Sequence, residues 1–470
     1  MNLFHHKDTK AQRYKEDLGP GTWDLGPVRR QASLRSPVSG LKSQVLLVSL
    51  CLCAFVIGAS ALQAQTNPAD QEALTKAEEA INAKDYAKAF AALEQLVARD
   101  PKNYRALFDI AYAYTMMGER AKAIDAYRKT LAVRPDLPQA SVNLATLLLE
   151  EKQPAEAAGL LAKVAAARPS DAHVQLLLAN ALAGSGQDTE AAVQYRKVLA
   201  LDPNSPEACL GLGRILAKQG RNAEAEQQFA RALQLQPGDP ATVLEAGRFY
   251  EAAGKGEQAL RLYTGLAARQ PQNAQARRRL GELLLHQKRY TEAATELEAA
   301  ARLAPSPQDD WSLARAYAGA KQPAQAVPLL RKVVAANPGD YDAHLLLGEM
   351  LTSLREFASA RPELEAAARL RPEVPDAWVD LANVLYLQGD LPGAVSMLDR
   401  VAATGRKTAW YYFLRAITLD KLEVLDEALE SYKQFLAAAN GAYPDQEFQA
   451  RQRIKAINLR LEKGWKRRKR

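Results

Sequence analysis

The sequence predicts an all-α protein, an α-solenoid of about eleven repeats that contain two helices each. Three series of residues with a period of 34 lead to this prediction. The first is a proline, found at positions 101, 135, 169, 203, 237, 271 and 305 and then at 338 and 372. The second is an alanine twelve residues before each proline, and it continues as Ala394 and Ala428 after the prolines stop. The third is a Gly or Ala twelve residues before each alanine, from Ala77 to Ala416. Internal similarity at a fixed period of this length is typical of units that bury their apolar faces by stacking on their neighbours.

The composition agrees with this architecture. Charged residues make up 25% of the chain and hydrophobic residues 48%, which are ordinary values for a globular protein. Runs of β-branched residues that alternate with polar ones are absent, so no sheet is expected. A chain of 470 residues would otherwise suggest about three domains, but a stack of repeats makes it one.

The spacing of these markers resembles the tetratricopeptide repeat (TPR) family. The second copy, residues 104–137, carries the resemblance most clearly through Leu107, Ile110, Ala111, Tyr114, Ala123, Tyr127 and Pro135, and the tenth retains the Trp of the pattern as Trp378. If Tyr104 is repeat position 1, the small residue falls at position 8, the alanine at position 20 and the proline at position 32. The resemblance implies a right-handed TPR superhelix, and we place the array at residues 70–443.

Each repeat is expected to fold as helix, turn and helix. The first helix has apolar residues at i, i+3, i+4 and i+7, and the second resumes after a break. Five breaks have a glycine that can end a helix in the left-handed conformation: Gly118, Gly186, Gly220, Gly254 and Gly389. The other six have Lys84, Lys152, Lys288, Lys321, Arg355 and Glu423, so those turns are expected to be strained or differently shaped. The small residues allow close approach of the paired helices, and the proline ends the second helix because it lacks an amide hydrogen.

Two features mark irregular points of the array. One step, between Ala293 and Ala326, is 33 residues long, and the segment Pro305-Ser306-Pro307 is the expected place of the missing residue. Beyond the array, residues 444–463 carry apolar residues, among them Phe448, Ile457 and Leu459, on an otherwise charged helix. We interpret this segment as a C-terminal capping helix that shields the last repeat. Residues 464–470 form a polybasic tail.

The first 69 residues do not belong to the array. Residues 1–44 are rich in Gly, Pro, Ser and Arg, which predicts a disordered basic segment. Residues 45–64 contain an uncharged stretch, Val45 to Leu62, which follows the basic flank and ends in the cleavage pattern Ala59-Ser60-Ala61. This layout is typical of a signal peptide, with a retained signal anchor as the alternative, and residues 65–69 form a linker. In both cases the repeats are expected outside the cytoplasm. A cleaved signal peptide would leave them periplasmic or secreted, and a retained anchor would attach them to the inner membrane.

The net charge of +8 is concentrated at the two ends of the chain. Residues 1–44 carry eight basic and four acidic residues, and the last five residues are all basic. The remaining chain is therefore close to neutral. A nucleic-acid-binding protein spreads basic charge over one face, so nucleic acid is not an expected partner.

The sequence offers no catalytic or metal-binding constellation. His173, His286 and His344 lie in different repeats without a carboxylate or Cys at ligand spacing. Gly211 and Gly213 lack the third glycine of a phosphate-binding loop and fall inside a predicted helix. Cys209 occupies an apolar position and is expected to be a packed core thiol. We therefore expect neither an enzyme nor a cofactor.

Function is then expected on the surface of the stack. The TPR resemblance implies that the first helices line a concave groove through repeat positions 2, 5, 9, 12 and 13. Carried onto this chain, these positions give the candidate partner-binding residues Arg214, Lys218, Arg248, Arg278, Glu282, Arg315, Tyr386, Trp410 and Phe413. The groove leans basic in the middle repeats and aromatic toward the C-terminus, which suits an extended protein segment held by a few anchors. Solvated helix faces would have the same composition, so this interpretation stays open.

The function predicted from the sequence is an exported scaffold that binds one or more proteins through its concave groove. The alternative is an envelope assembly or carrier factor that binds an exopolysaccharide or the machinery of another envelope polymer. Sugar binding would need a platform of stacked aromatic rings, for which the groove offers only Trp311, Tyr386 and Trp410. The identity of the partner cannot be predicted from the sequence.

Overall fold

The structure of the protein, a computed structural model, describes residues 68–468, and from residue 463 only the backbone. The segments predicted for residues 1–64 lie outside the described residues. The described chain forms two compact units, which we name the N-terminal unit (68–269) and the C-terminal unit (270–468). The sequence predicted one array. Stacked repeats contact mainly their neighbours, so a long array need not behave as one compact body.

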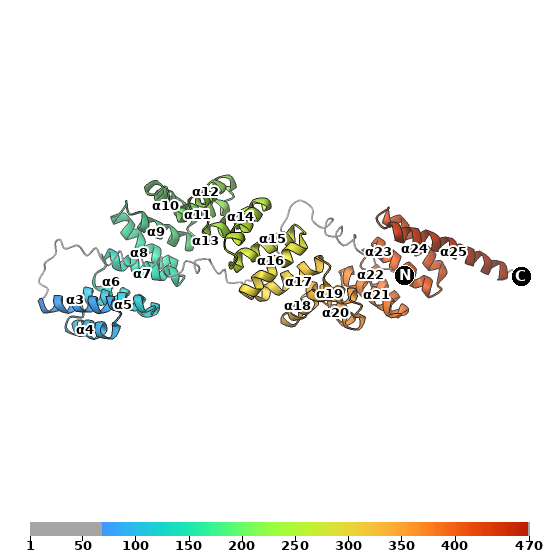
Figure 1. The fold of residues 1–470 in the computed structure, drawn as a ribbon, viewed down its shortest axis with the longest axis horizontal. Helices are drawn as coiled ribbons and strands as arrows, with labels where there is room; N and C mark the ends of the chain where they lie inside the picture. The colour runs from blue at the N-terminus through green and yellow to red at the C-terminus, as the bar shows by residue number, and fades with distance from the viewer. Residues whose placement is uncertain (1–67, 469–470) are drawn as a thin grey trace. The chain divides into compact units, whose positions relative to one another are not determined.

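Both units consist of helices joined by short turns, and Figure 1 shows them as successive helix pairs. The N-terminal unit contains α3 (Pro68–Asn82), α4 (Tyr86–Arg99), α5 (Tyr104–Met117), α6 (Arg120–Val133), α7 (Pro138–Glu150), α8 (Pro154–Ala167), α9 (Ala172–Gly184), α10 (Asp188–Leu201), α11 (Pro206–Lys218), α12 (Asn222–Leu235), α13 (Pro240–Ala252) and α14 (Gly256–Arg269). The C-terminal unit contains α15 (Ala274–His286), α16 (Tyr290–Leu303), α17 (Pro307–Gly319), α18 (Pro323–Ala336), α19 (Tyr341–Ser353), α20 (Phe357–Leu370), α21 (Pro375–Gln388), α22 (Leu391–Ala403), α23 (Ala409–Lys421), α24 (Leu425–Ala439) and α25 (Pro444–Arg468). Over the described residues these are eleven helix pairs and one further helix, and the predicted all-α class is confirmed.

Local chemistry explains where the helices begin. Many first helices start after a side chain that accepts a hydrogen bond from the backbone N–H three residues on, as Ser205 does from Ala208 at 3.2 Å. Such caps satisfy amides that have no partner within the helix. Pro138, Pro206, Pro240, Pro307 and Pro375 occupy the first helical turn, where the missing N–H costs nothing. The first helix α3 begins at Pro68, two residues before the predicted start of the array.

The turns inside the repeats share one backbone conformation. All five predicted turn glycines have positive φ, and so do Lys84, Lys152, Lys288, Lys321, Arg355 and Glu423, with φ between 59° and 63°. The turn is therefore strained at the six charged residues, but it is not differently shaped. The geometry of the helix pair fixes the turn, and a residue with a Cβ atom accepts the strain.

The paired helices touch at the small residues. Ala111 and Ala123 are fully buried. At Gly247 a Cβ atom would lie 2.3 Å from the ring of Tyr263, and at Gly281 it would lie 2.6 Å from Leu297. The large residue in both contacts is at repeat position 24, on the second helix of the same repeat. The small residue at position 8 is thus the space into which the residue at position 24 fits.

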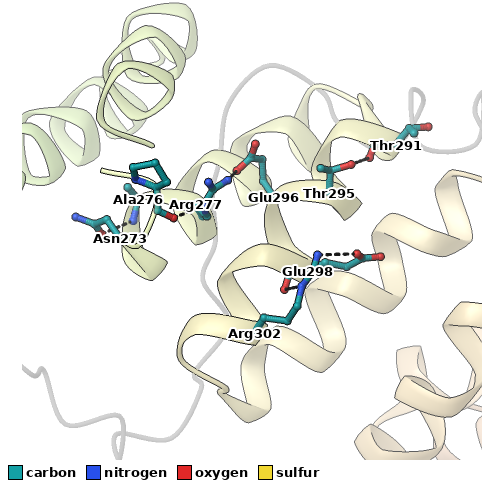
Figure 2. A network of polar contacts seen from close by, with 9 residues as sticks. Asn273, Ala276, Arg277, Thr291, Thr295, Glu296, Glu298 and Arg302 are labelled. Atoms are coloured by element: carbon teal, nitrogen blue, oxygen red, sulfur yellow. Dashed lines mark hydrogen bonds and ion pairs between the residues drawn. The ribbon is translucent and has the colours of Figure 1, made fainter. Parts of the chain in front are cut away.

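A hydrogen bond closes several junctions between repeats. Side chains at repeat position 4 donate an N–H to the carbonyl of the periodic proline that precedes their repeat. The contacts are Gln175 to Pro169 at 3.3 Å, Arg277 to Pro271 at 2.8 Å and Trp378 to Pro372 at 3.0 Å. In the ninth repeat His344 Nε2 lies 3.1 Å from the Pro338 oxygen. Arg277 also reaches Glu296 on α16 at 2.7 Å, as Figure 2 shows. One side chain therefore links the junction loop to both helices of the repeat that follows.

The short step and the C-terminal helix both occur where expected. Only residues 304–306 separate α16 from α17, whereas four residues, 202–205, separate α10 from α11. Ala450 on α25 follows Ala416 by 34 residues and is fully buried, so α25 continues the array in the place of a first helix. Ile457 is fully buried as well, but Phe448 is 63% exposed and Leu459 58% exposed, so these two residues do not cap the last repeat as predicted. The helix runs through Arg468 rather than ending at residue 463.

Candidate partner-binding surface

The first helices of neighbouring repeats lie close to one another. Within the N-terminal unit α3 packs against α5, α9 against α11 and α11 against α13, and within the C-terminal unit α15 packs against α17 and α19 against α21. Second helices of neighbouring repeats have no contact of this extent in the described residues. Each unit therefore curves locally with its first helices on the inner side, where the TPR resemblance placed the groove.

Buried tyrosines hold polar residues on this inner side of the N-terminal unit. Position 24 is occupied by Tyr127, Tyr195 and Tyr263 in the second, fourth and sixth repeats, and each side chain is fully buried. The Tyr195 hydroxyl donates to Asn180 Oδ1 at 2.7 Å, and the Tyr263 hydroxyl donates to Glu251. Asn143 Nδ2 donates to the Tyr127 hydroxyl at 3.0 Å. Burial raises the pKa of Tyr195 to about 12, so this hydroxyl keeps its proton at neutral pH.

An ion pair lies between the fifth and sixth repeats. Arg214 Nε is 2.7 Å from Glu245 Oε1, with the Arg214 side chain 51% exposed and the Glu245 side chain only 14% exposed. Burial raises the pKa of Glu245, and the positive charges of Arg214 and then Arg248 counteract this effect. Both predicted groove arginines therefore face the same half-buried carboxylate. Gly211 on α11 leaves space for the Tyr195 ring of the preceding repeat, because a Cβ atom there would lie 2.3 Å from that ring.

Other predicted groove residues already have partners within the chain. Lys218 forms an ion pair with Asp188 of the preceding repeat while its side chain stays 65% exposed. Glu282 pairs with Arg279 at 3.1 Å on the same helix. Arg315 is exposed and its guanidinium lies 5.9 Å from the centre of the Trp311 ring. These contacts are solvent-accessible, so they leave the three residues able to meet a partner.

Arg278 has a different role from the one predicted. Its guanidinium binds both oxygens of Asp309, at 2.5 and 2.9 Å, and donates to the carbonyl of Ala304 at 2.9 Å. The Asp309 side chain is 3% exposed. Arg278 on α15 is therefore linked to α17 and to the shortened junction after α16, and it neutralises a buried carboxylate.

The aromatic end of the predicted groove is corrected by the structure. Trp410 is 8% exposed and Phe413 is 2% exposed, so neither offers an open surface to a partner. Their rings lie 5.5 Å apart, and Phe413 packs against Phe435 at 5.0 Å in the core of the last repeat. Tyr386 is only half-buried and carries Lys421 over its ring at 5.1 Å. The physical reason is that both rings belong to one buried apolar cluster with Phe435 of α24 and Ile457 of α25.

Several functional candidates lay outside the positions taken from the resemblance. Asp109, Asn143 and Glu245 share repeat position 6, which is one residue after a predicted groove position and on the same helix face as positions 2 and 9. A search for polar residues on the otherwise apolar inner stripe of the first helices would have found them. Asp420 on α23 is bound by Arg453 of α25 at 2.6 and 2.7 Å and is not free for a partner.

The described residues contain no group of three or more His, Cys, Asp or Glu side chains that could hold a metal ion. Cys209 is fully buried, as expected of a core thiol, and burial raises its pKa. Among the described helices, none has the length and apolarity needed to cross a bilayer. The apolar stretch Val45 to Leu62 lies outside the described residues.

Comparison with known families now identifies the repeats. The family model described as the cilia and flagella-associated protein 70 C-terminal domain, a TPR domain, matches residues 57–311, which is more than half of the chain. The tetratricopeptide repeat model matches residues 317–366 and 351–417. The chain belongs to the TPR family. The TPR array therefore extends through both units.

Individual relatives resemble parts of this TPR array. The TPR and J domain-containing co-chaperone DNJ1 of Fusarium oxysporum f. sp. lycopersici is 34% identical over 103 residues, which are 21% of this chain and 20% of that protein. The chain thus matches only about a fifth of that relative's length. Among solved structures, PilW, a type IV pilus biogenesis factor, is 25% identical over 44% of this chain and 96% of its own, with a TM-score of 0.38. YrrB, described as a TPR protein with an unusual peptide-binding site, is 21% identical over 39% of this chain and 95% of its own, with a TM-score of 0.35.

Proposed function

We propose that this protein is a TPR scaffold that binds an extended segment of a partner protein along the inner face of its N-terminal unit. The observation that carries the proposal is the set of polar side chains that the core holds in place there. Asn180 and Glu251 are fixed by buried tyrosines, and Arg214 is fixed by Glu245. Groups that are already ordered lose little conformational entropy when a ligand binds.

The arrangement suits a peptide backbone with acidic or amide side chains. Arg214 and Arg248 occupy the same position in adjacent repeats, and stacked helices are about 8 to 10 Å apart. Two guanidinium groups at that spacing can address successive acceptors of an extended chain. Arg278 does not extend this binding surface, because Asp309 and Ala304 already occupy its donors.

The test is binding of the partner recovered by pull-down from a cell-envelope extract with the full chain as bait. Arg214 and Arg248 are replaced by Gln together with Glu245→Gln, so that no half-buried carboxylate is left without its cation. We expect affinity for the captured partner to fall at least about tenfold and its salt dependence to flatten. The matched control is Arg196→Gln, an exposed residue on the second helix α10 that makes the same change in net charge. Unchanged binding in the triple variant would overturn the proposed surface.

We also propose that the repeats act outside the cytoplasm. The support is the order of a basic flank, an uncharged stretch at residues 45–62 and the pattern Ala59-Ser60-Ala61 in the sequence. Cell fractionation with protease protection tests this proposal. Full-length protein recovered from the soluble cytoplasmic fraction would overturn it without bearing on the binding surface.

A further inference from the structure

A buried carboxyl group on the inner face of the N-terminal unit has no hydrogen-bond or ion-pair partner among the described residues. Asp109 lies on the first helix α5 and is 9% exposed. Within the described residues it accepts no hydrogen bond and forms no ion pair. A carboxylate removed from water is costly unless a cation or hydrogen-bond donors compensate it. An uncompensated carboxyl at this depth is therefore an exception that calls for an explanation.

The nearest cation on the same helix is directed elsewhere. Arg105 precedes Asp109 by one helical turn, the spacing at which an ion pair forms easily. Its guanidinium instead donates to Gln71 Oε1 of α3 at 3.1 Å. Arg105 therefore acts on Asp109 only through its charge and makes no hydrogen bond or ion pair with it.

The groups around Asp109 come from three helices. Glu78 on α3 is exposed, and its negative charge raises the pKa of Asp109 further, while Arg105 lowers it. The buried Tyr127 of α6 lies close enough that the charge of Asp109 raises the pKa of Tyr127. The Tyr127 hydroxyl accepts a hydrogen bond from Asn143 of α7. Phe108, half-buried on α5, packs edge-on against the Tyr127 ring with centroids 5.7 Å apart. The site therefore combines two carboxyl groups with an apolar aromatic wall.

We propose that Asp109 is the receptor for a cationic side chain, Lys or Arg, carried by the extended partner segment. The inference rests on the proposed function and names a specificity site within it. The ammonium or guanidinium group would meet Asp109 and Glu78, which lie on helices that pack against each other, and its aliphatic stem would lie along Phe108. A cation on the partner would thus form the ion pair with Asp109 that no described residue of this chain forms.

Proton exchange accompanies this contact. Burial raises the pKa of Asp109 to about 8, so the free carboxyl holds a proton at neutral pH. When the cation binds, the O–H bond of the carboxyl breaks, the proton passes to solvent, and a carboxylate forms opposite the cation. Binding should therefore tighten as pH rises toward about 8 and then level off, because above that pH the carboxyl is already ionised.

The experiment uses the full chain and a library of acetylated, amidated decapeptides in which one central residue is fixed as Lys, Arg, Gln or Glu and the others are randomised. Binding of each pool is followed by fluorescence polarisation at pH 6, 7, 8 and 9. We expect the Lys and Arg pools to bind at least about tenfold more tightly than the Gln pool at pH 8, and less selectively at pH 6. Asp109→Asn should abolish both the preference and its pH dependence. Asp125→Asn, the same change at an exposed site on α6, should alter neither.

The outcomes separate the two proposals. Pools that bind equally well, or a Lys and Arg preference that survives Asp109→Asn, would overturn the cation site while leaving the peptide-binding scaffold in place. Failure of every pool to bind would argue against peptide binding by the inner face as a whole. Because Asp109→Asn removes a buried titratable group without changing its shape, a melting temperature equal to or above that of the unchanged chain shows that the variant is folded.

Discussion

The two units are built from the same repeat but carry a different mix of residues at repeat position 24, which is buried throughout. Position 24 carries Leu93, Tyr127, Leu161, Tyr195, Phe229 and Tyr263 in the N-terminal unit, and Leu297, Leu330, Leu364, Leu398 and Tyr432 in the C-terminal unit. All of these side chains are at most 1% exposed. Tyrosine brings a hydroxyl group into the core, and that group needs a hydrogen-bond partner. Leucine makes no such demand.

This difference shows how the core shapes the surface. In the N-terminal unit the tyrosine hydroxyls reach polar residues of the first helices, such as Asn180 and Glu251, and fix them on the inner side. In the four leucine repeats of the C-terminal unit the first helices are tied by charge, as between Arg278 and Asp309. Polar groups held by a tyrosine at position 24 therefore occur in three repeats of the N-terminal unit, whereas among the described residues of the C-terminal unit only the last repeat has such a contact, from the Tyr432 hydroxyl to Asp420 at 3.1 Å.

The largest expected effect is a pH response limited to the N-terminal unit. The pKa of Asp109 is raised to about 8 from an ordinary value near 4, so the folded state binds an extra proton between these values. Stability should fall as pH rises from about 4 to about 8, by at most about 1.4 kcal/mol per pH unit, and then stay level. Hydrogen exchange across this range should show the loss in residues 68–269. Asp109→Asn should remove it, and equal losses in both units would contradict the assignment to Asp109.

The ion pair between Arg278 and Asp309 in the C-terminal unit gives the next largest effect. Arg278→Ala would leave the 3% exposed Asp309 carboxylate without its cation, and we expect a loss on the order of 3 kcal/mol in the free energy of unfolding. Urea denaturation measures this loss. Arg302→Ala serves as the control, because its ion pair with Glu298 is exposed and should contribute less than about 1 kcal/mol. Similar costs for the two variants would contradict the claim that the buried Asp309 carboxylate depends on Arg278 for its charge compensation.

The fit between positions 8 and 24 can be tested with one methyl group. Gly247→Ala places a Cβ atom 2.3 Å from the Tyr263 ring and should cost about 1 to 3 kcal/mol. Gly265→Ala in α14 is the matched control, since the nearest atom outside its own helix backbone is 3.7 Å away. That change should stabilise the helix by about 0.5 to 1 kcal/mol. Thermal unfolding of the pair should therefore show shifts of opposite sign.

Removal of a tyrosine hydroxyl measures the link between core and inner face. Tyr195→Phe keeps the ring and leaves Asn180 Oδ1 without its donor, which should cost about 1 kcal/mol. The stability measurement is paired with partner binding, which should weaken because Asn180 is no longer fixed. Phe229 already has no hydroxyl group, so Phe229→Leu should affect stability alone. A Tyr195→Phe variant with unchanged affinity would separate the hydroxyl from function.

The smallest effect is expected in the turns and should be alike in both units. Lys152 in the N-terminal unit and Lys321 in the C-terminal unit have φ of 59° and 62°. Glycine adopts this conformation without the clash of a Cβ atom, so Lys152→Gly and Lys321→Gly should each stabilise the protein by about 0.5 to 1 kcal/mol. Calorimetry on the two variants measures the gain. A gain in only one of them would show that the turns are not equivalent.

The sequence by itself determined the repeat and its boundaries. The spacing of Ala111, Ala123 and Pro135 predicted two close helices and a junction, and the structure has them. Turn conformation followed from Gly118 and its counterparts, and the 33-residue step predicted the short junction at residues 304–306. These features depend on contacts within one repeat, between residues a few turns apart in sequence. Such contacts recur with the period and are visible as a pattern.

Only the tertiary structure decided which inner residues face a partner. Arg214 and Arg278 look alike in the sequence, but a half-exposed ion pair holds one and a buried carboxylate holds the other. Trp410 falls at a groove position and is nevertheless buried near α24, while Asp109 falls outside the groove positions and lacks a partner there. The physical reason is that charge pairing and burial depend on side chains from the next repeat or the next helix pair. The repeat fixes where those side chains start, and their individual size and charge determine what they meet.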